Sequence, residues 1–201
     1  MEELIKKLTK KIGESEKDLI SKHFDEEEED LTGRLLQSIE KDINNIENNG
    51  YSIKTKIFRR KNNLQESIFG ADCCVILRVN DSMEKYFLSQ AKKVDTKSLF
   101  KVESKLKEQC LKMQKVTSDA FVFVYTKDGI YVKSALNDLK IFKTFEEFFG
   151  DFLSFFIGEI HYWKYRYPHY DNFIRYLSFS PYKLSEEMNV LLIEINDNKK
   201  N

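Results

Sequence analysis

The sequence predicts an α/β protein with a mixed β-sheet of four to five strands flanked by helices. Two observations lead to this fold class. The expected order of elements is two helices, three strands, a helix, two strands and a helix, which permits a mixed sheet covered on both faces. The chain of 201 residues also carries 16 Phe, 10 Tyr and 1 Trp, enough large side chains to fill a core. Because its 2 Pro and 7 Gly are spread along the chain, we expect a single domain.

The first two expected elements are amphipathic helices. Apolar residues at helical spacing predict one helix over residues 1–20 and a second from about Glu26 to Ile46. Turn residues at 48–50 end the second helix.

Three strands follow in the sequence. Strict alternation predicts a strand over 51–58, and a β-branched apolar run predicts another over 70–79. Turn residues at 80–82 lead into a return strand over 85–94, so that the last two strands form a hairpin.

A Lys-rich helix over 99–115 and an apolar strand over 120–126 continue the pattern. A turn at 127–129 then leads into a strand over 130–132. The central part of the domain is therefore expected at about 26–135.

The last part of the chain, about 142–201, is expected to be an aromatic-rich helical C-terminal extension. An apolar helix is predicted over 145–163, followed by a last amphipathic stretch near 188–195. Rings interleaved with cations could stack on single-stranded bases. Because the phenylalanines from Phe145 onward recur at helical spacing, packing or dimerisation is the favoured interpretation.

Composition excludes several classes of protein. With 33 Lys plus Arg against 33 Asp plus Glu, the chain is not a uniformly basic nucleic-acid coat. No run approaches 18 apolar residues, and the N-terminus lacks the apolar stretch of a secretory signal, so we expect a cytoplasmic protein with no membrane partner. The three cysteines, Cys73, Cys74 and Cys110, are expected to be buried thiols.

Charge is nevertheless uneven along the chain. Residues 51–115 carry 15 basic and 7 acidic side chains, a net charge of +8. Such a local excess favours a surface that faces a polyanion, although an exposed Lys-rich helix is the simpler explanation.

Three polar side chains are expected to gather on the predicted hairpin. A hairpin centred on Ser82 places Asp72 opposite Lys92, and alternation puts Gln90 on the same face as Lys92. Their neighbours in both strands are apolar, and burial of an unpaired charge is costly. A structural ion pair between Asp72 and Lys92 is one explanation.

A divalent metal site is the other explanation. The carboxylate of Asp72 and the carbonyl oxygen of Gln90 could hold a cation, while Lys92 orients or deprotonates water. Glu28 shares a face of the second helix with the apolar stripe and is the candidate for a third ligand. Glu29 remains an alternative, because an acidic run at a helix start is also favoured by the helix dipole.

Three segments of the chain resemble the sequence elements of the PD-(D/E)xK nuclease superfamily, in its Mrr-like restriction endonuclease subgroup, where Gln replaces the second acidic residue. The segments are Glu28 to Thr32, Gly70 to Asp72 and Gln90 to Lys92. The resemblance spans about 26–132, and it departs from the family pattern at Ala71, where a proline often precedes the aspartate.

The resemblance implies a restriction endonuclease-like core, with a mixed sheet between helices. It also implies DNA cleavage with Mg²⁺ (or Mn²⁺), with Asp72, Gln90, Lys92 and Glu28 as site residues, and a place in restriction or antiviral defence. Cations near this site would hold the phosphate backbone. The candidates are Arg59, Arg60, Lys61, Lys93 and Lys97.

The sequence offers no base-reading module, so control is expected from homo-oligomerisation or from a separate sensor or helicase-type subunit. Two alternatives stay open. One is an inactive subunit of the same fold that binds nucleic acid or a partner protein, and the other is an unrelated α/β ligand-binding domain.

Overall fold

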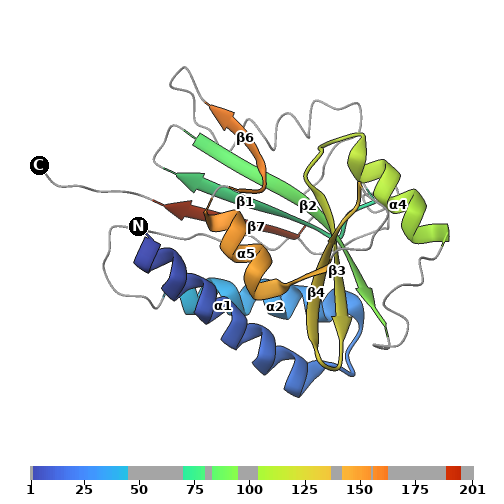
Figure 1. Cartoon of the computed structure of the whole chain (residues 1–201). Helices are drawn as coiled ribbons and strands as arrows, with labels where there is room; N and C mark the ends of the chain where they lie inside the picture. The colour runs from blue at the N-terminus through green and yellow to red at the C-terminus, as the bar shows by residue number, and fades with distance from the viewer. Residues whose placement is uncertain are drawn as a thin grey trace, which may run out of the picture.

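The computed structural model describes residues 2–44, 70–79, 83–94, 104–136, 142–154, 156–162 and 189–195. They form a mixed β-sheet with helices on both faces (Figure 1), which confirms the predicted α/β class. The helices are α1 (Glu2–His23), α2 (Glu28–Asn44), α4 (Ser104–Gln114) and α5 (Phe145–Leu153). The strands are β1 (Cys73–Val79), β2 (Met83–Lys93), β3 (Ala120–Thr126), β4 (Gly129–Ser134), β5 (Phe142–Thr144), β6 (Glu159–Tyr162) and β7 (Asn189–Ile195).

The sheet has seven strands within the described residues, more than the four to five expected. Its order is β5-β4-β3-β2-β1-β7, and β6 pairs with β2 beside that path. Strand β1 runs antiparallel to β2 and parallel to β7, while β2 runs parallel to β3. Three of the seven strands, β5, β6 and β7, were not expected, and all three lie at or beyond residue 142.

Helices cover the two faces of the sheet unequally. Helices α1, α2 and α5 pack on one face and α4 on the other (Figure 1). Phe87 of β2 lies fully buried at the centre of the larger face, with its ring 4.9 Å from that of Phe152 and 5.1 Å from that of Phe148. The edge-to-face arrangement of these rings is the favoured geometry for aromatic packing.

The expected helices and strands upstream of residue 135 are confirmed over the residues that the structure describes. The amphipathic pattern of α1 buries Leu8, Ile12 and Leu19, and α2 buries Leu31 and Leu35 completely. The strand predicted over 51–58 lies outside the described residues.

The predicted helix over 145–163 is wrong beyond Leu153. A capping box between Thr144 and Glu147 starts α5, and its phenylalanines Phe145, Phe148, Phe149 and Phe152 are buried, as the packing interpretation required. Gly158 then adopts φ +104°, a conformation that a helix does not contain.

The helical C-terminal extension predicted over 142–201 is confirmed over α5 and is wrong for the three strands described there, the first of which is β5. Residues 159–162 pair with β2 as β6, and 189–195 lie beside β1 as β7. Both are short runs in which apolar residues predominate or alternate, and periodicity alone does not separate a short buried strand from a helix segment.

The register of the β1–β2 hairpin differs from the predicted one by two residues. Cys73 lies opposite Ser89 and Val79 opposite Met83, so Asp72 falls opposite Gln90 and not opposite Lys92. The hairpin is centred on residue 81 and not on Ser82. Because side chains alternate with a period of two, a shift of two residues leaves every side chain on its predicted face.

All three cysteines are buried and free, as predicted. Among the helices in the described residues, none has the length and apolar character needed to span a bilayer.

Lys85 of β2 is completely buried and provides a test of this packing. Its Nζ donates a hydrogen bond to the carbonyl oxygen of Ile157 at 2.6 Å and lies 4.5 Å from the centre of the Phe152 ring. Burial lowers the pKa of Lys85 to about 7, against the opposing influence of Asp119.

We expect the stability of the protein to rise with pH above about 7, through Lys85. The folded-state pKa lies below that of the unfolded chain, so the unfolded state binds more protons between these values and folding gains as pH rises. Lys85→Met should lack this gain, which urea titrations at about pH 7 and about pH 9 would measure. Lys107→Met, at an exposed position of α4, is the control. A constant difference between wild type and Lys85→Met across this window contradicts the assignment.

Candidate functional site

Strand β2 continues past the end of β1, and two carboxylates accept hydrogen bonds from the backbone of the part of β2 that is not paired with β1. The ladder between these strands reaches Cys73 and Ser89, so the N–H groups of Ala91 and Lys93 lie beyond it. Asp72 Oδ2 accepts a hydrogen bond from Ala91 N at 2.8 Å, and Glu28 Oε1 accepts one from Lys93 N at 2.9 Å. The rise of a strand separates these two N–H groups by about 6.6 Å, which makes the carboxylates neighbours along one edge.

Gln90 contributes an amide directly beside Asp72. Its Nε2 donates to Asp72 Oδ2 and to the carbonyl oxygen of Ala91, the latter at 3.2 Å. Both partners are acceptors, which fixes the orientation of the amide group. Its Oε1 is buried and has no hydrogen-bond partner, so it is an acceptor suited to a cation.

The ammonium group of Lys92 lies beside the carboxylate of Glu28. Lys92 Nζ is 3.8 Å from Glu28 Oε2, and the two side chains are 20% and 32% exposed. The structure therefore brings Asp72, Gln90, Glu28 and Lys92 to one end of the sheet. They come from α2, β2 and the residue before β1.

The structure also separates Glu28 from Glu29. Glu28 reaches the edge of β2, whereas Glu29 is exposed on α2. Thr32, one turn further along α2, donates from Oγ1 to the carbonyl oxygen of Glu28 at 2.8 Å and lies 3.1 Å from the Tyr125 hydroxyl. These bonds hold the first turn of α2 against β3 and so position Glu28.

Two buried groups close to the carboxylates, the Tyr125 phenol and the Cys73 thiol, stay neutral. Burial raises the pKa of the Tyr125 phenol, and the negative charges of Asp72 and Glu28 add to the effect. Burial likewise raises the pKa of the Cys73 thiol, with Asp72 acting in the same direction. The charge at this end of the sheet is therefore carried by the carboxylates and the lysines and not by the phenol or thiol.

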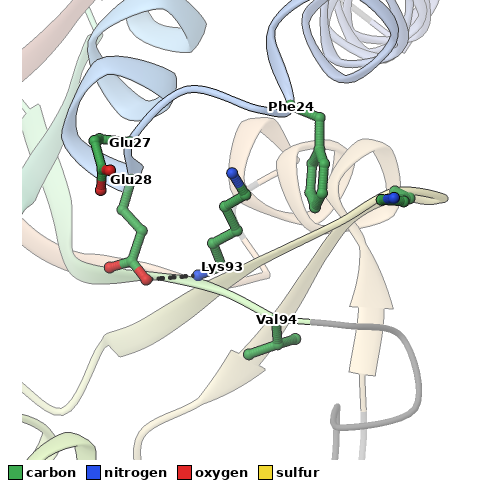
Figure 2. A pocket seen from close by; sticks show the side chains of 6 residues that line it. Phe24, Glu27, Glu28, Lys93 and Val94 are labelled. Carbon is green, nitrogen blue, oxygen red and sulfur yellow. Dashed lines mark hydrogen bonds between the residues drawn. The ribbon is translucent and has the colours of Figure 1, made fainter.

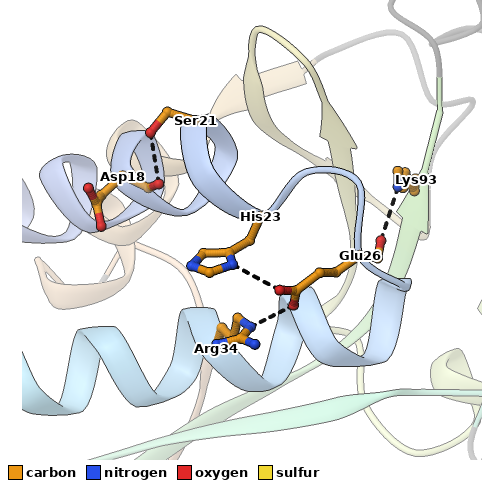
Figure 3. Close-up of polar contacts among 6 residues, drawn as sticks. All are labelled: Asp18, Ser21, His23, Glu26, Arg34 and Lys93. Atoms are coloured by element: carbon orange, nitrogen blue, oxygen red, sulfur yellow. Dashed lines mark hydrogen bonds and ion pairs between the residues drawn. The ribbon is translucent and has the colours of Figure 1, made fainter.

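A network of polar contacts fixes the turn that leads into α2 (Figure 3). Glu26 Oε2 accepts a hydrogen bond from Arg34 Nε at 2.6 Å, and Glu26 Oε1 lies 2.8 Å from His23 Nδ1. The Arg34 guanidinium beside Glu26 holds the pKa of that carboxyl below its usual value. Lys93 Nζ donates to the Glu26 carbonyl oxygen at 3.0 Å and lies 4.7 Å from the centre of the Phe24 ring.

Of the five cations predicted to bind phosphate, only Lys93 is among the described residues. Lys93 points toward the turn between α1 and α2, as Figures 2 and 3 show. Arg59, Arg60, Lys61 and Lys97 lie outside the described residues.

Gly70 is a positioning residue that sequence reasoning did not assign. It has φ +68°, and a Cβ atom there would lie 2.2 Å from the carbonyl oxygen of Gln109 in α4. The chain thus passes against α4 immediately before Asp72. An isolated glycine before a strand was the available signal.

The donor set at this edge fits a hard divalent cation. The described residues contain no group of three or more His, Cys, Asp and Glu side chains placed to share a metal ion. Two carboxylates and the partnerless amide oxygen of Gln90 are nevertheless all oxygen ligands, the kind that Mg²⁺ and Mn²⁺ prefer.

Comparisons of the chain with protein-family models, with curated proteins and with solved structures give no match.

Substitution of Gly70 tests the close approach to α4. We expect Gly70→Ala to lower the free energy of unfolding by about 2–4 kcal/mol, because the alanine would adopt a left-handed conformation and overlap the Gln109 backbone. Gly33→Ala in α2 is the matched control, since a Cβ there meets nothing within 4 Å. That variant should gain about 0.5–1 kcal/mol in urea denaturation. Equal effects of the two substitutions contradict the close approach.

Proposed function

We propose that the protein is a metal-dependent DNA endonuclease with a restriction endonuclease-like core. The observation that carries this proposal is the pair of carboxylates, Asp72 and Glu28, aligned along the edge of β2 beside Gln90 Oε1 and Lys92 Nζ. The order of these residues in the chain also agrees with the resemblance to the PD-(D/E)xK superfamily. The hydrolysed bond is a phosphodiester.

Each residue has a distinct task in this proposal. Asp72, Glu28 and Gln90 Oε1 hold the cation, and a bound Mg²⁺ would supply a Lewis acid for the phosphate and a more acidic water. Lys92, whose ammonium lies 3.8 Å from Glu28 Oε2, orients the attacking water and stabilises the negative charge that develops on phosphorus oxygens.

The charge distribution of the chain supports an anionic substrate. The segment 51–115 contains both strands that form the site and carries a net charge of +8. Lys92 belongs to this segment and lies beside Glu28, and its charge would offset part of the repulsion between the carboxylates and a phosphate backbone.

A role as the effector of a restriction or antiphage defence system, gated by oligomerisation or by a partner subunit, is part of the proposal. It is supported by the family resemblance.

A binding subunit without hydrolytic activity is the second candidate. The observation in its favour is Gln90 itself, because a neutral amide stands where a carboxylate would add negative charge to a metal site. In this case the fold would bind nucleic acid or a partner protein through the same surface.

We expect the purified full chain to cut plasmid DNA in Mg²⁺ or Mn²⁺ and not in a chelator. Asp72→Asn, Glu28→Gln and Lys92→Met should each lower the rate by roughly 100-fold or more. The first two variants keep an oxygen that can accept from Ala91 N or Lys93 N, so the fold should survive. Gel analysis of nicked and linear products measures the effect.

Glu29→Gln is the matched control, because it makes the same change one residue along α2 and should retain wild-type activity. Titration calorimetry with Mn²⁺ should show binding that Asp72→Asn weakens. Metal binding without cleavage in any substrate favours the binding subunit. Absence of both metal binding and cleavage contradicts the proposed function.

A further inference from the structure

A pocket of about 410 Å³ lies directly beside the proposed metal site (Figure 2). It is bounded by the turn between α1 and α2, by the end of β2 and by the turn between β3 and β4. Its volume is within the range of pockets that take one small ligand. The lining residues are Phe24, Glu27, Glu28, Lys93, Val94 and Lys127.

Glu28 belongs to both the pocket and the metal site. One of its carboxylate oxygens accepts from the backbone of Lys93, and the other faces the ammonium of Lys92. A ligand in the pocket would therefore lie next to a cation held by Asp72 and Glu28.

The pocket walls are held in place by contacts that do not involve a ligand. Lys93 Nζ is fixed by the Glu26 carbonyl oxygen and by the Phe24 ring. On the opposite side, the buried carboxylate of Glu16 in α1 accepts a hydrogen bond from Ile130 N at 2.6 Å, which anchors the hairpin that carries Lys127. Such fixed walls reduce the cost of ordering on binding.

The lining chemistry favours a neutral ligand that has both apolar surface and hydrogen-bonding groups. Two lysines and two glutamates balance in charge, so the pocket does not select an isolated phosphate. Phe24 and Val94 supply apolar surface, while ammonium and carboxylate groups supply donors and acceptors. A nucleobase combines an apolar face with donors and acceptors at its edge.

We propose that this pocket takes one unpaired nucleobase of the strand whose phosphate lies at Asp72 and Glu28. This inference rests on the proposed nuclease function and names its substrate class, which is DNA with an unpaired nucleotide beside the cut. A base within a continuous duplex enters a side pocket only by leaving the stack, and that costs a few kcal/mol.

Binding in a chelator tests the proposal without cleavage. Fluorescence anisotropy of the full chain would compare a labelled duplex with one unpaired nucleotide, the same duplex with that nucleotide abasic, and a fully paired duplex. We expect the intact unpaired nucleotide to bind about tenfold or more tightly than either of the others, as base–aromatic stacking implies.

Phe24→Ala should abolish the difference between the intact and abasic strands. Lys127→Ala, at an exposed position, should reduce that difference and serves as a second variant if Phe24→Ala does not fold. Phe156→Ala is the control, because Phe156 is 79% exposed and lies outside the pocket, and it should leave the difference unchanged.

Equal affinity for the intact and abasic strands, or no binding of any strand, overturns the proposal. If a free mononucleotide competes while the abasic strand binds as well as the intact one, the pocket serves a free nucleotide and the proposal also fails. Cleavage without base discrimination leaves the nuclease function standing and removes this inference. Base discrimination without cleavage or Mn²⁺ binding would show a nucleobase pocket but would remove the nuclease function on which this inference rests.

Discussion

The site depends on the unequal lengths of two paired strands. Strand β2 has 11 residues and β1 has 7, so the N–H groups of Ala91 and Lys93 extend beyond the ladder that joins them. A buried backbone N–H without a partner costs about 1–3 kcal/mol. Asp72 and Glu28 satisfy these two groups, and the same requirement places two negative charges side by side. The geometry of the candidate site is thus a consequence of completing the backbone hydrogen bonds of the sheet.

The contact made by Glu28 is also part of how α2 packs on the sheet. Leu31 and Leu35 of α2 are fully buried, and the Thr32 hydroxyl lies against that of Tyr125 in β3. These contacts set the helix in position, and Glu28 then reaches Lys93 N from its first turn. Packing of the helix and placement of the carboxylate are therefore not independent. A change that shifts α2 along the sheet would move Glu28 away from Lys92 and Lys93.

The sequence placed Glu28, Gln90 and Lys92 on the correct elements, and it placed Asp72 one residue inside a strand that begins at Cys73. Strand periodicity tolerates an error of two in register. The hairpin is centred one residue earlier than predicted, yet Gln90 and Lys92 keep their faces. Only one feature of the sequence favoured Glu28 over Glu29, namely that Glu28 lies on the same face of the second helix as the apolar residues. The hydrogen bonds from the β2 backbone to Asp72 and Glu28 could not be predicted, because they depend on the residue at which the β1–β2 pairing ends. The C-terminal strands β5, β6 and β7 were missed. Short apolar runs such as those of β6 and β7 fit either period, and Gly158 was the signal against a long helix.

Gln90 combines a hydrogen bond that holds Asp72 with a buried polar atom that has no partner among the described residues. Its Nε2 holds Asp72 and the Ala91 carbonyl, which leaves Oε1 buried without a donor. An apolar side chain of similar size would remove that unsatisfied acceptor, at a gain of about 1–3 kcal/mol, but it would also release the Asp72 carboxylate. The amide of Gln90 therefore holds Asp72 in place at the cost of a buried carbonyl oxygen that has no hydrogen-bond partner in the described part of the chain. A buried polar atom without a partner needs a physical reason in a native structure, and the proposed cation would supply one here.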